Sequence, residues 1–231
     1  MIDITGWDYF YKMDVSGLPE TTNMLYAPRV NSDTSIMCMD YGNTQSYLTK
    51  ARLTKDTTEF FFNREVDNLT TFQQYSWAPK LLEVDTVNLR IFTEFSSNTV
   101  NRILLTEDRD LEREYPNWQN QMLTMLLDLD SAGYYKMALY PHCFYFTDEG
   151  VLKTFDFFSV ISKQNHFIKL SLIQPIMGDD TNFNRFKRSE IEQSETMIDF
   201  DVFFEITMKE QLTLRWPNNP FPSFYDKLNN V

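Results

Sequence analysis

The chain has 231 residues, of which 42% are hydrophobic and 16% aromatic, and its formal net charge is −12. This composition excludes a disordered chain and supplies the core of one large domain or two closely packed lobes. The negative charge disfavours nucleic acids and anionic membranes as partners, and it would attract a basic protein.

Cysteine usage and the start of the chain bear on its compartment. Cys38 and Cys143 fall in segments that we interpret as strands, and neither has metal-ligand spacing. We expect free, buried thiols and a reducing compartment, the cytoplasm. The first thirty residues contain several acids and no apolar run, and no segment approaches 18 consecutive apolar residues. We therefore expect no signal peptide and no membrane span.

The first part of the chain predicts an antiparallel sheet with one helix, and we assign residues 1–95 to a β-rich N-terminal lobe. A strand or short helix is expected at 7–13. Short turns favour antiparallel pairing of the strands that follow. The helix is indicated by apolar residues at helical spacing. In chain order, the expected elements are strands at 24–27, 35–41 and 46–51, a helix at 57–75, and strands at 81–85 and 89–95.

Residues 96–231 predict a mainly helical C-terminal lobe. The strongest helix pattern covers 117–129, where the apolar residues share one face, and Gly133 follows it as a C-cap residue would. The tail from 216 to 231 contains three prolines and is interpreted as extended. The other expected elements are helices at 99–105, 185–193 and 198–212, a β-hairpin at 143–155, and an irregular segment at 159–180.

The segment between the 117–129 helix and the hairpin is the most informative part of the sequence. It reads Lys-Met-Ala-Leu-Tyr-Pro-His-Cys from Lys136 to Cys143, and Asp156-Phe157-Phe158 follows the hairpin. This layout resembles the catalytic loop, hairpin and metal-binding turn of the protein-kinase superfamily. Leu139 and Pro141 match the kinase pattern His-Arg-Asp-Leu-Lys-Pro-x-Asn. The resemblance implies an α+β, bilobal kinase-like fold.

The resemblance also implies a nucleotide site with ATP and Mg²⁺ as cofactors. Lys50 takes the place of the ATP-contacting lysine, and Glu65 takes that of the glutamate with which it pairs. Glu94 and Phe95 would enter the hinge, and Asp156 would hold the metal ion. From the residues alone, a surface position for Lys50 and Glu65, or a turn-capping role for Asp156, is equally open.

The groups that phosphoryl transfer needs are replaced. Ala138 stands at the position of the catalytic aspartate and offers no proton acceptor, while Cys143 replaces the metal-binding asparagine. A thiol is a poor ligand for Mg²⁺, which prefers oxygen. Lys136 stands where kinases hold a structural histidine, and the expected phosphate-covering loop at 28–33 has no glycine. We therefore expect a degenerate, pseudokinase-like chain without kinase activity.

Three functions follow from these observations. The leading hypothesis is a catalytically impaired kinase-like protein that binds a protein partner or a nucleotide. The alternative is an active phosphotransferase or nucleotidyltransferase with displaced catalytic residues. The second alternative is a viral structural or assembly protein, which would fit the aromatic content, the extended tail and the acidic composition. The abundance of Asn, Phe and Tyr resembles that of phage and large-virus proteins, without indicating a role. A viral origin would place the chain in the host cytoplasm.

Overall fold

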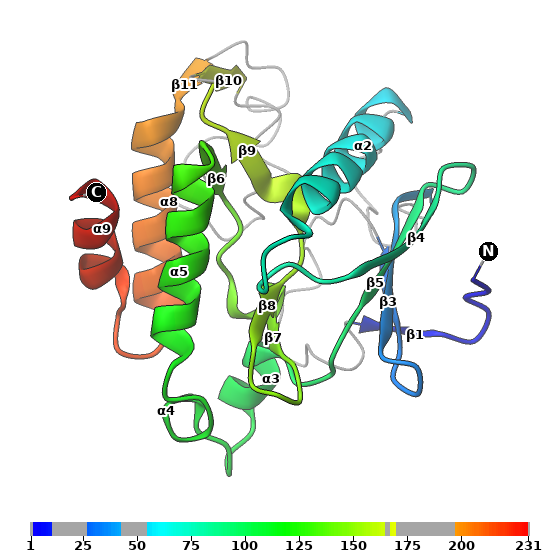
Figure 1. Cartoon of the computed structure of the whole chain (residues 1–231), viewed down its shortest axis with the longest axis horizontal. Helices are drawn as coiled ribbons and strands as arrows, with labels where there is room; N and C mark the ends of the chain where they lie inside the picture. The colour runs from blue at the N-terminus through cyan, green and yellow to red at the C-terminus, as the bar shows by residue number, and fades with distance from the viewer. Residues whose placement is uncertain (1, 11–26, 43–54, 165–166, 170–196, 231) are drawn as a thin grey trace, which may run out of the picture. The chain divides into compact units, whose positions relative to one another are not determined.

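The computed structural model describes residues 2–10, 27–42, 55–164, 167–169 and 197–230 (Figure 1). Two compact units are formed from alternating parts of the chain. The first contains Met1–Trp118 and His142–Phe158, and the second contains Gln119–Pro141 and Ser159–Val231. The predicted boundary at residue 95 does not coincide with these units, because the hairpin that follows the loop belongs to the first one.

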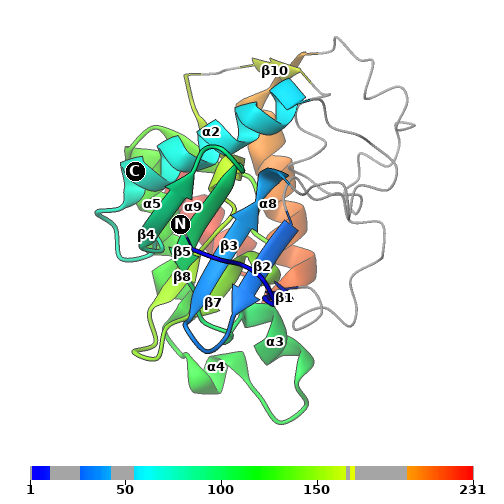
Figure 2. The same cartoon turned by 90° about the vertical axis from the view of Figure 1, so that its right-hand side faces the viewer.

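A five-stranded antiparallel sheet forms the framework of the first unit, in the order β1-β2-β3-β5-β4 (Figure 2). Together with the helices, it has the composition of an α+β fold, as expected. The predicted strand at 46–51 lies outside the described residues. The strands are β1 (Asp8–Tyr9), β2 (Ala27–Asn31), β3 (Ile36–Asp40), β4 (Leu81–Asp85) and β5 (Arg90–Glu94).

The loop expected at 28–33 is wrong in its position. Residues 28–31 belong to strand β2 and pair with β3, and the connecting turn covers only 32–35. Ser35 closes this turn with a positive φ of 52°. Pro28 interrupts the residue pattern that would have indicated strand β2. A proline is tolerated in a strand at a position where its missing N–H is not needed.

Helix α2 (Lys55–Phe72) lies between β3 and β4 in the chain and confirms the helix predicted at 57–75. Its buried residues include aromatic rings and three polar residues, Thr58, Glu65 and Asn68. The ring of Phe72 packs on Trp77, with 5.4 Å between centroids, and Trp77 stacks on Phe157 at 6.1 Å. These contacts join the end of α2 to the segment after the hairpin.

The rest of the first unit contains helices α3 (Val100–Leu105) and α4 (Leu111–Glu114) and the hairpin of β7 (Phe144–Phe146) and β8 (Leu152–Thr154). Thr99 caps α3 through its side chain, which accepts the N–H of Arg102, and Asp110 caps α4 in the same way. The helix predicted at 99–105 and the hairpin predicted at 143–155 are both confirmed.

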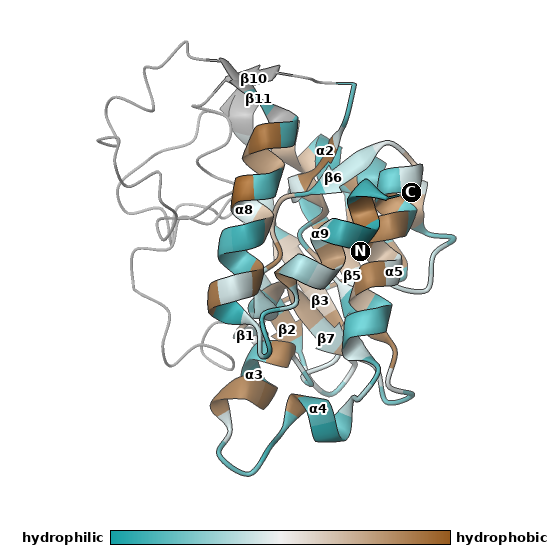
Figure 3. Cartoon of the chain, turned by 90° about the vertical axis from the view of Figure 1, so that its left-hand side faces the viewer, coloured by the Kyte–Doolittle hydropathy of each residue, from teal (hydrophilic) through white to brown (hydrophobic). Residues whose placement is uncertain are grey.

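The second unit contains the helix α8 (Phe200–Arg215) and, except for its first residue, the strong helix of the sequence, α5 (Trp118–Ser131). Gly133 follows α5 with φ of 79°, and its N–H donates to the carbonyl of Asp130, as the C-cap prediction requires. Helix α8 begins where the carboxylate of Asp199 accepts two backbone N–H groups. Hydrophobic and hydrophilic residues alternate along α8 (Figure 3).

Two predictions for the second unit are wrong. The irregular segment at 159–180 contains strand β9 (Val160–Ser162), which pairs with β6 (Tyr134–Lys136), and strand β10 (Phe167–Lys169), which pairs with β11 (Met197–Asp199). The extended tail is helical from Phe221 to Asn229, which form α9. Its prolines lie at the cap and in the first turn, where a helix tolerates them. The helix predicted at 185–193 lies outside the described residues.

In the part of the chain that the structure describes, none of the helices is long and apolar enough to cross a membrane.

Candidate functional site

The turn that follows β8 places Asp156 against Cys143. The backbone N–H of Phe155 and the hydroxyl of Thr154 both donate to the carbonyl of Cys143, at 3.1 and 2.9 Å. Asp156 then adopts a left-handed backbone with φ of 64°, a conformation that Asp and Asn tolerate better than most residues. Its Oδ2 lies 2.9 Å from the Sγ of Cys143, whose thiol donates to it.

Burial changes the ionisation of Asp156. The side chain is 8% exposed, and desolvation raises its pKa to about 8. The carboxyl group is therefore mainly protonated and neutral at pH 7. The group that donates to this carboxyl is a thiol, which is a poor ligand for Mg²⁺. The metal role that the kinase resemblance implies for Asp156 stays a prediction.

Glu65 is the centre of the polar network beside this turn. It is 0% exposed on α2, and its Oε1 accepts the backbone N–H of Phe157 at 2.9 Å. Its Oε2 accepts the N–H of Phe158 and also the hydroxyl of Tyr41, the latter at 3.3 Å. Burial, and next the charge of Glu65, raise the pKa of Tyr41 well above its ordinary value. The carboxylate thus holds the two residues that follow Asp156.

The expected partner of Glu65, Lys50, lies outside the described residues, so the predicted ion pair stays a prediction. A second side chain of α2 also holds the turn. Asn68, one helical turn after Glu65, donates from Nδ2 to the carbonyl of Phe157 at 2.7 Å. Both backbone polar groups of Phe157 are therefore bound by side chains of α2.

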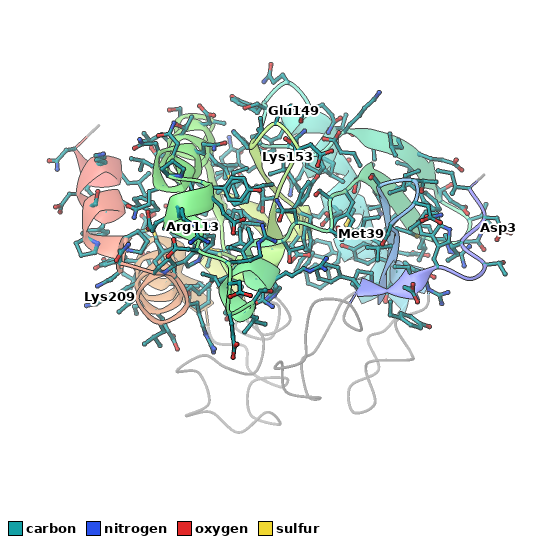
Figure 4. The ribbon with its side chains drawn as sticks, turned by 90° about the horizontal axis from the view of Figure 1, so that it is seen from below. Asp3, Met39, Arg113, Glu149, Lys153 and Lys209 are labelled. Atoms are coloured by element: carbon teal, nitrogen blue, oxygen red, sulfur yellow. The ribbon has the colours of Figure 1, made fainter. Side chains whose placement is uncertain are left out.

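Glu94 and Phe95, the predicted hinge residues, lie at the end of β5, where internal bonds engage their polar groups. The carboxylate of Glu94 forms an ion pair with Lys153 of β8, which is labelled in Figure 4, and it accepts the N–H of Lys80 at 2.9 Å. The N–H of Glu94 donates to the carbonyl of Lys80, and its own carbonyl accepts the hydroxyl of Tyr145 at 3.2 Å.

The backbone N–H of Phe95 donates to the carbonyl of Ser35 at 2.8 Å, and its side chain is buried. The ring packs on Tyr145, with 5.5 Å between centroids. Burial, followed by the charge of Glu94, raises the pKa of Tyr145 well above its ordinary value, so the hydroxyl remains a donor. Hinge groups that would contact a nucleotide are thus bonded within the first unit.

The loop that resembles a catalytic loop is divided between the two units. In the second unit, Lys136 of β6 is 0% exposed, and its Nζ lies 3.4 Å from the Oγ of Ser159. Ala138 is also buried. The side-chain amide of Gln211 brackets it, donating to the carbonyl of Met137 at 2.8 Å and accepting the N–H of Leu139. The indole of Trp216 donates to the carbonyl of Leu139 at 2.7 Å.

Replacing Gln211 with alanine is expected to lower the free energy of unfolding by about 2–4 kcal/mol, because a buried N–H and a buried carbonyl lose their partner. Urea unfolding measures the change. Leu214 on the same helix is 68% exposed, and Leu214→Ala is the matched control, with an expected change below about 0.5 kcal/mol. Equal effects of the two substitutions would contradict the anchoring of the loop by Gln211.

Sequence reasoning found Glu65, Glu94, Asp156 and Cys143, but it missed three residues that bond to them or to the turn after Asp156: Asn68, Tyr41 and Tyr145. The position of Asn68 could have indicated its role, because a polar residue three positions after Glu65 lies on the same face of the helix. The positions of Tyr41 and Tyr145 could not, since their bonds join residues 24 and 51 positions apart. Among the described residues, groups of three or more His, Cys, Asp or Glu side chains that could hold a metal ion do not occur.

Comparison with known proteins gives little. No protein-family model matches the chain, and no curated protein matches it. A solved structure of WbdD with the kinase inhibitor LY294002 is similar over 62% of this chain, with 16% identity and a TM-score of 0.44. The similar part spans about a third, 32%, of that chain.

Proposed function

We propose that the chain is a kinase-like protein that does not transfer phosphate and acts by binding a protein partner. Support for the kinase-like part comes from the order of elements: an antiparallel sheet with α2 inserted between β3 and β4, then helices and the hairpin that precedes Asp156. The loss of chemistry is supported by Ala138 and Cys143 at the positions where the resemblance expects an aspartate and an asparagine.

The observation that carries the proposal is the environment of Asp156, which is buried, bonded by the thiol of Cys143 and raised in pKa. Phosphoryl transfer depends on a metal ion that bridges the phosphates and neutralises their charge. The only acid that the resemblance assigns to that metal is buried, neutral at pH 7 and directed at a thiol. An active phosphotransferase would need this carboxyl to be charged and accessible, so this function is the weaker candidate.

The net charge of −12 favours a basic partner, because opposite charges accelerate the encounter and suppress acidic competitors. Co-purification at low and high salt tests this part. We expect a stoichiometric basic partner whose recovery falls as salt rises, since screening weakens contacts between exposed charges. Recovery of the chain alone would count against a binding function.

The absence of phosphoryl transfer is tested by thermal unfolding with ATP and Mg²⁺ and by a phosphotransfer assay. A ligand present at 100 times its Kd stabilises the native state by about 2.7 kcal/mol, which would raise Tm by several degrees. We expect no rise at about 1 mM ATP and no transfer. A Mg²⁺-dependent rise that Asp156→Asn abolishes, together with transfer, would overturn the proposal.

A further inference from the structure

We propose that the N-terminal segment is a strap that closes an aromatic site in the first unit, with Phe10 as its built-in occupant. When the ring of Phe10 is absent, the site would take a small, planar, uncharged aromatic molecule. This inference goes beyond the proposed function and does not depend on it, because it concerns a ring site and its cover rather than a protein partner.

The beginning of the strap lies on one face of the sheet. Ile4 packs in a cluster with Cys38 of β3 and Phe92 of β5, and Trp7 meets Phe92 edge-on at 6.1 Å between centroids. Cys38 and Phe92 are paired residues on neighbouring strands, so they share this face. The strap therefore covers apolar residues that would otherwise be exposed to water.

The middle of the strap passes the edge of the sheet. Strand β1 pairs with β2 only through Asp8 and Tyr9. The guanidinium of Arg29 lies over the ring of Tyr9 at 4.6 Å and donates from Nη2 to its hydroxyl at 3.1 Å. These are the contacts of a short edge strand, which contributes little backbone pairing to the sheet.

The end of the described strap inserts Phe10 among other rings. The side chain is 0% exposed, and it meets Phe95 at 5.8 Å and Phe155 at 5.7 Å, in both cases edge to face. Phe95 also contacts Tyr145. These spacings are typical of favourable aromatic pairs. A ring from the N-terminus thus packs against the rings that directly follow β5 and β8.

The position of Phe10 relates this site to the nucleotide site that the kinase resemblance implies. Phe95 adjoins Glu94, and Phe155 immediately precedes Asp156, so Phe10 lies between the two groups of residues that the kinase resemblance assigns to a nucleotide. Recognition at the site rests on ring shape and apolar contact, since the hydroxyl of Tyr145 is bonded to the carbonyl of Glu94. An apolar cavity of this kind stays dry and binds small aromatic molecules.

The test is whether indole restores thermal stability to the Phe10→Ala variant of the full chain. Thermal unfolding measures the change in Tm. Removing a buried phenyl ring should lower Tm by about 10 °C. We expect millimolar indole to restore about 3 °C or more to Phe10→Ala and to leave the unaltered chain unchanged, because its site is filled. Cyclohexanol, which is not planar, should restore less.

The matched control is Ile103→Ala, which removes another fully buried side chain of the first unit, on α3. Equal rescue of Ile103→Ala by indole would overturn the proposal, as would the absence of any rescue of Phe10→Ala. If Phe10→Ala does not fold on its own, its refolding from urea is compared with and without millimolar indole, and refolding that indole does not promote would overturn the proposal.

Discussion

Replacing Glu65 with alanine should lower the free energy of unfolding by about 3–5 kcal/mol. The substitution leaves the backbone N–H groups of Phe157 and Phe158 and the hydroxyl of Tyr41 without their acceptor. Each buried donor that loses its partner costs about 1–3 kcal/mol, and a hydrogen bond to a charged group is stronger than a neutral one. Urea unfolding, followed by tryptophan fluorescence, measures the loss.

Two further variants make this result specific to the turn. Asp67 lies on the exposed side of α2, and Asp67→Ala should change stability by less than about 0.5 kcal/mol. Glu65→Gln keeps the size of the side chain but replaces one acceptor oxygen with an amide donor that faces an N–H. It should therefore lose nearly as much stability as alanine. A loss below about 1 kcal/mol for both Glu65 variants would show that the carboxylate does not hold the turn.

Replacing Asp156 with asparagine should stabilise the protein, and the gain should grow with pH. The pKa of Asp156 is raised from 3.8 to about 8 in the folded chain, so between these values the folded state binds more protons than the unfolded state. Stability of the unaltered chain therefore falls as pH rises through this window, by at most about 1.4 kcal/mol per pH unit. Below the window, both states are protonated and the contribution vanishes.

Asparagine has no proton to lose and tolerates the left-handed backbone of this position, so Asp156→Asn should remove the dependence on pH. Urea unfolding at pH 5, 6, 7 and 8 measures the difference between the two proteins, which should reach several kcal/mol at pH 8. Asp156→Ala is the control for the side chain, because alanine is strained at a positive φ and has no polar group. A difference that stays constant across the pH range would contradict the raised pKa.

Elements with a clear hydrophobic period were predictable, and elements defined by distant pairing were not. Helix α2 carries its apolar residues at helical spacing, and the hairpin β7–β8 is local, so both follow from neighbouring residues. Strand β9 is three residues long and pairs with β6, more than twenty residues earlier in the chain. Helix α9 was hidden by its prolines, which are as common in extended tails as in a first helical turn.

The candidate site shows the same division. Glu65, Cys143 and Asp156 were found because the kinase resemblance gives each of them a place in a local motif. Their partners could not be found in this way, since Glu65 binds backbone groups that lie 92 and 93 residues away. Because every residue except proline has a backbone N–H, the type of residue does not reveal which backbone donors a carboxylate will bind. The burial that raises the pKa of Asp156 is likewise a product of the whole first unit.

The division of the chain into alternating segments has a consequence for how the protein is made. The first unit is completed by His142–Phe158, which follow part of the second unit in the chain. During synthesis, the sheet and α2 therefore emerge before the hairpin and the turn that Glu65 binds. Until then, the carboxylate of Glu65 lacks the backbone N–H groups that it accepts in the finished fold. The last stage of assembly cannot begin until about two thirds of the chain has left the ribosome. A single cut in the chain therefore cannot separate the two units, and a fragment that carries one unit alone needs a new connection between its two segments.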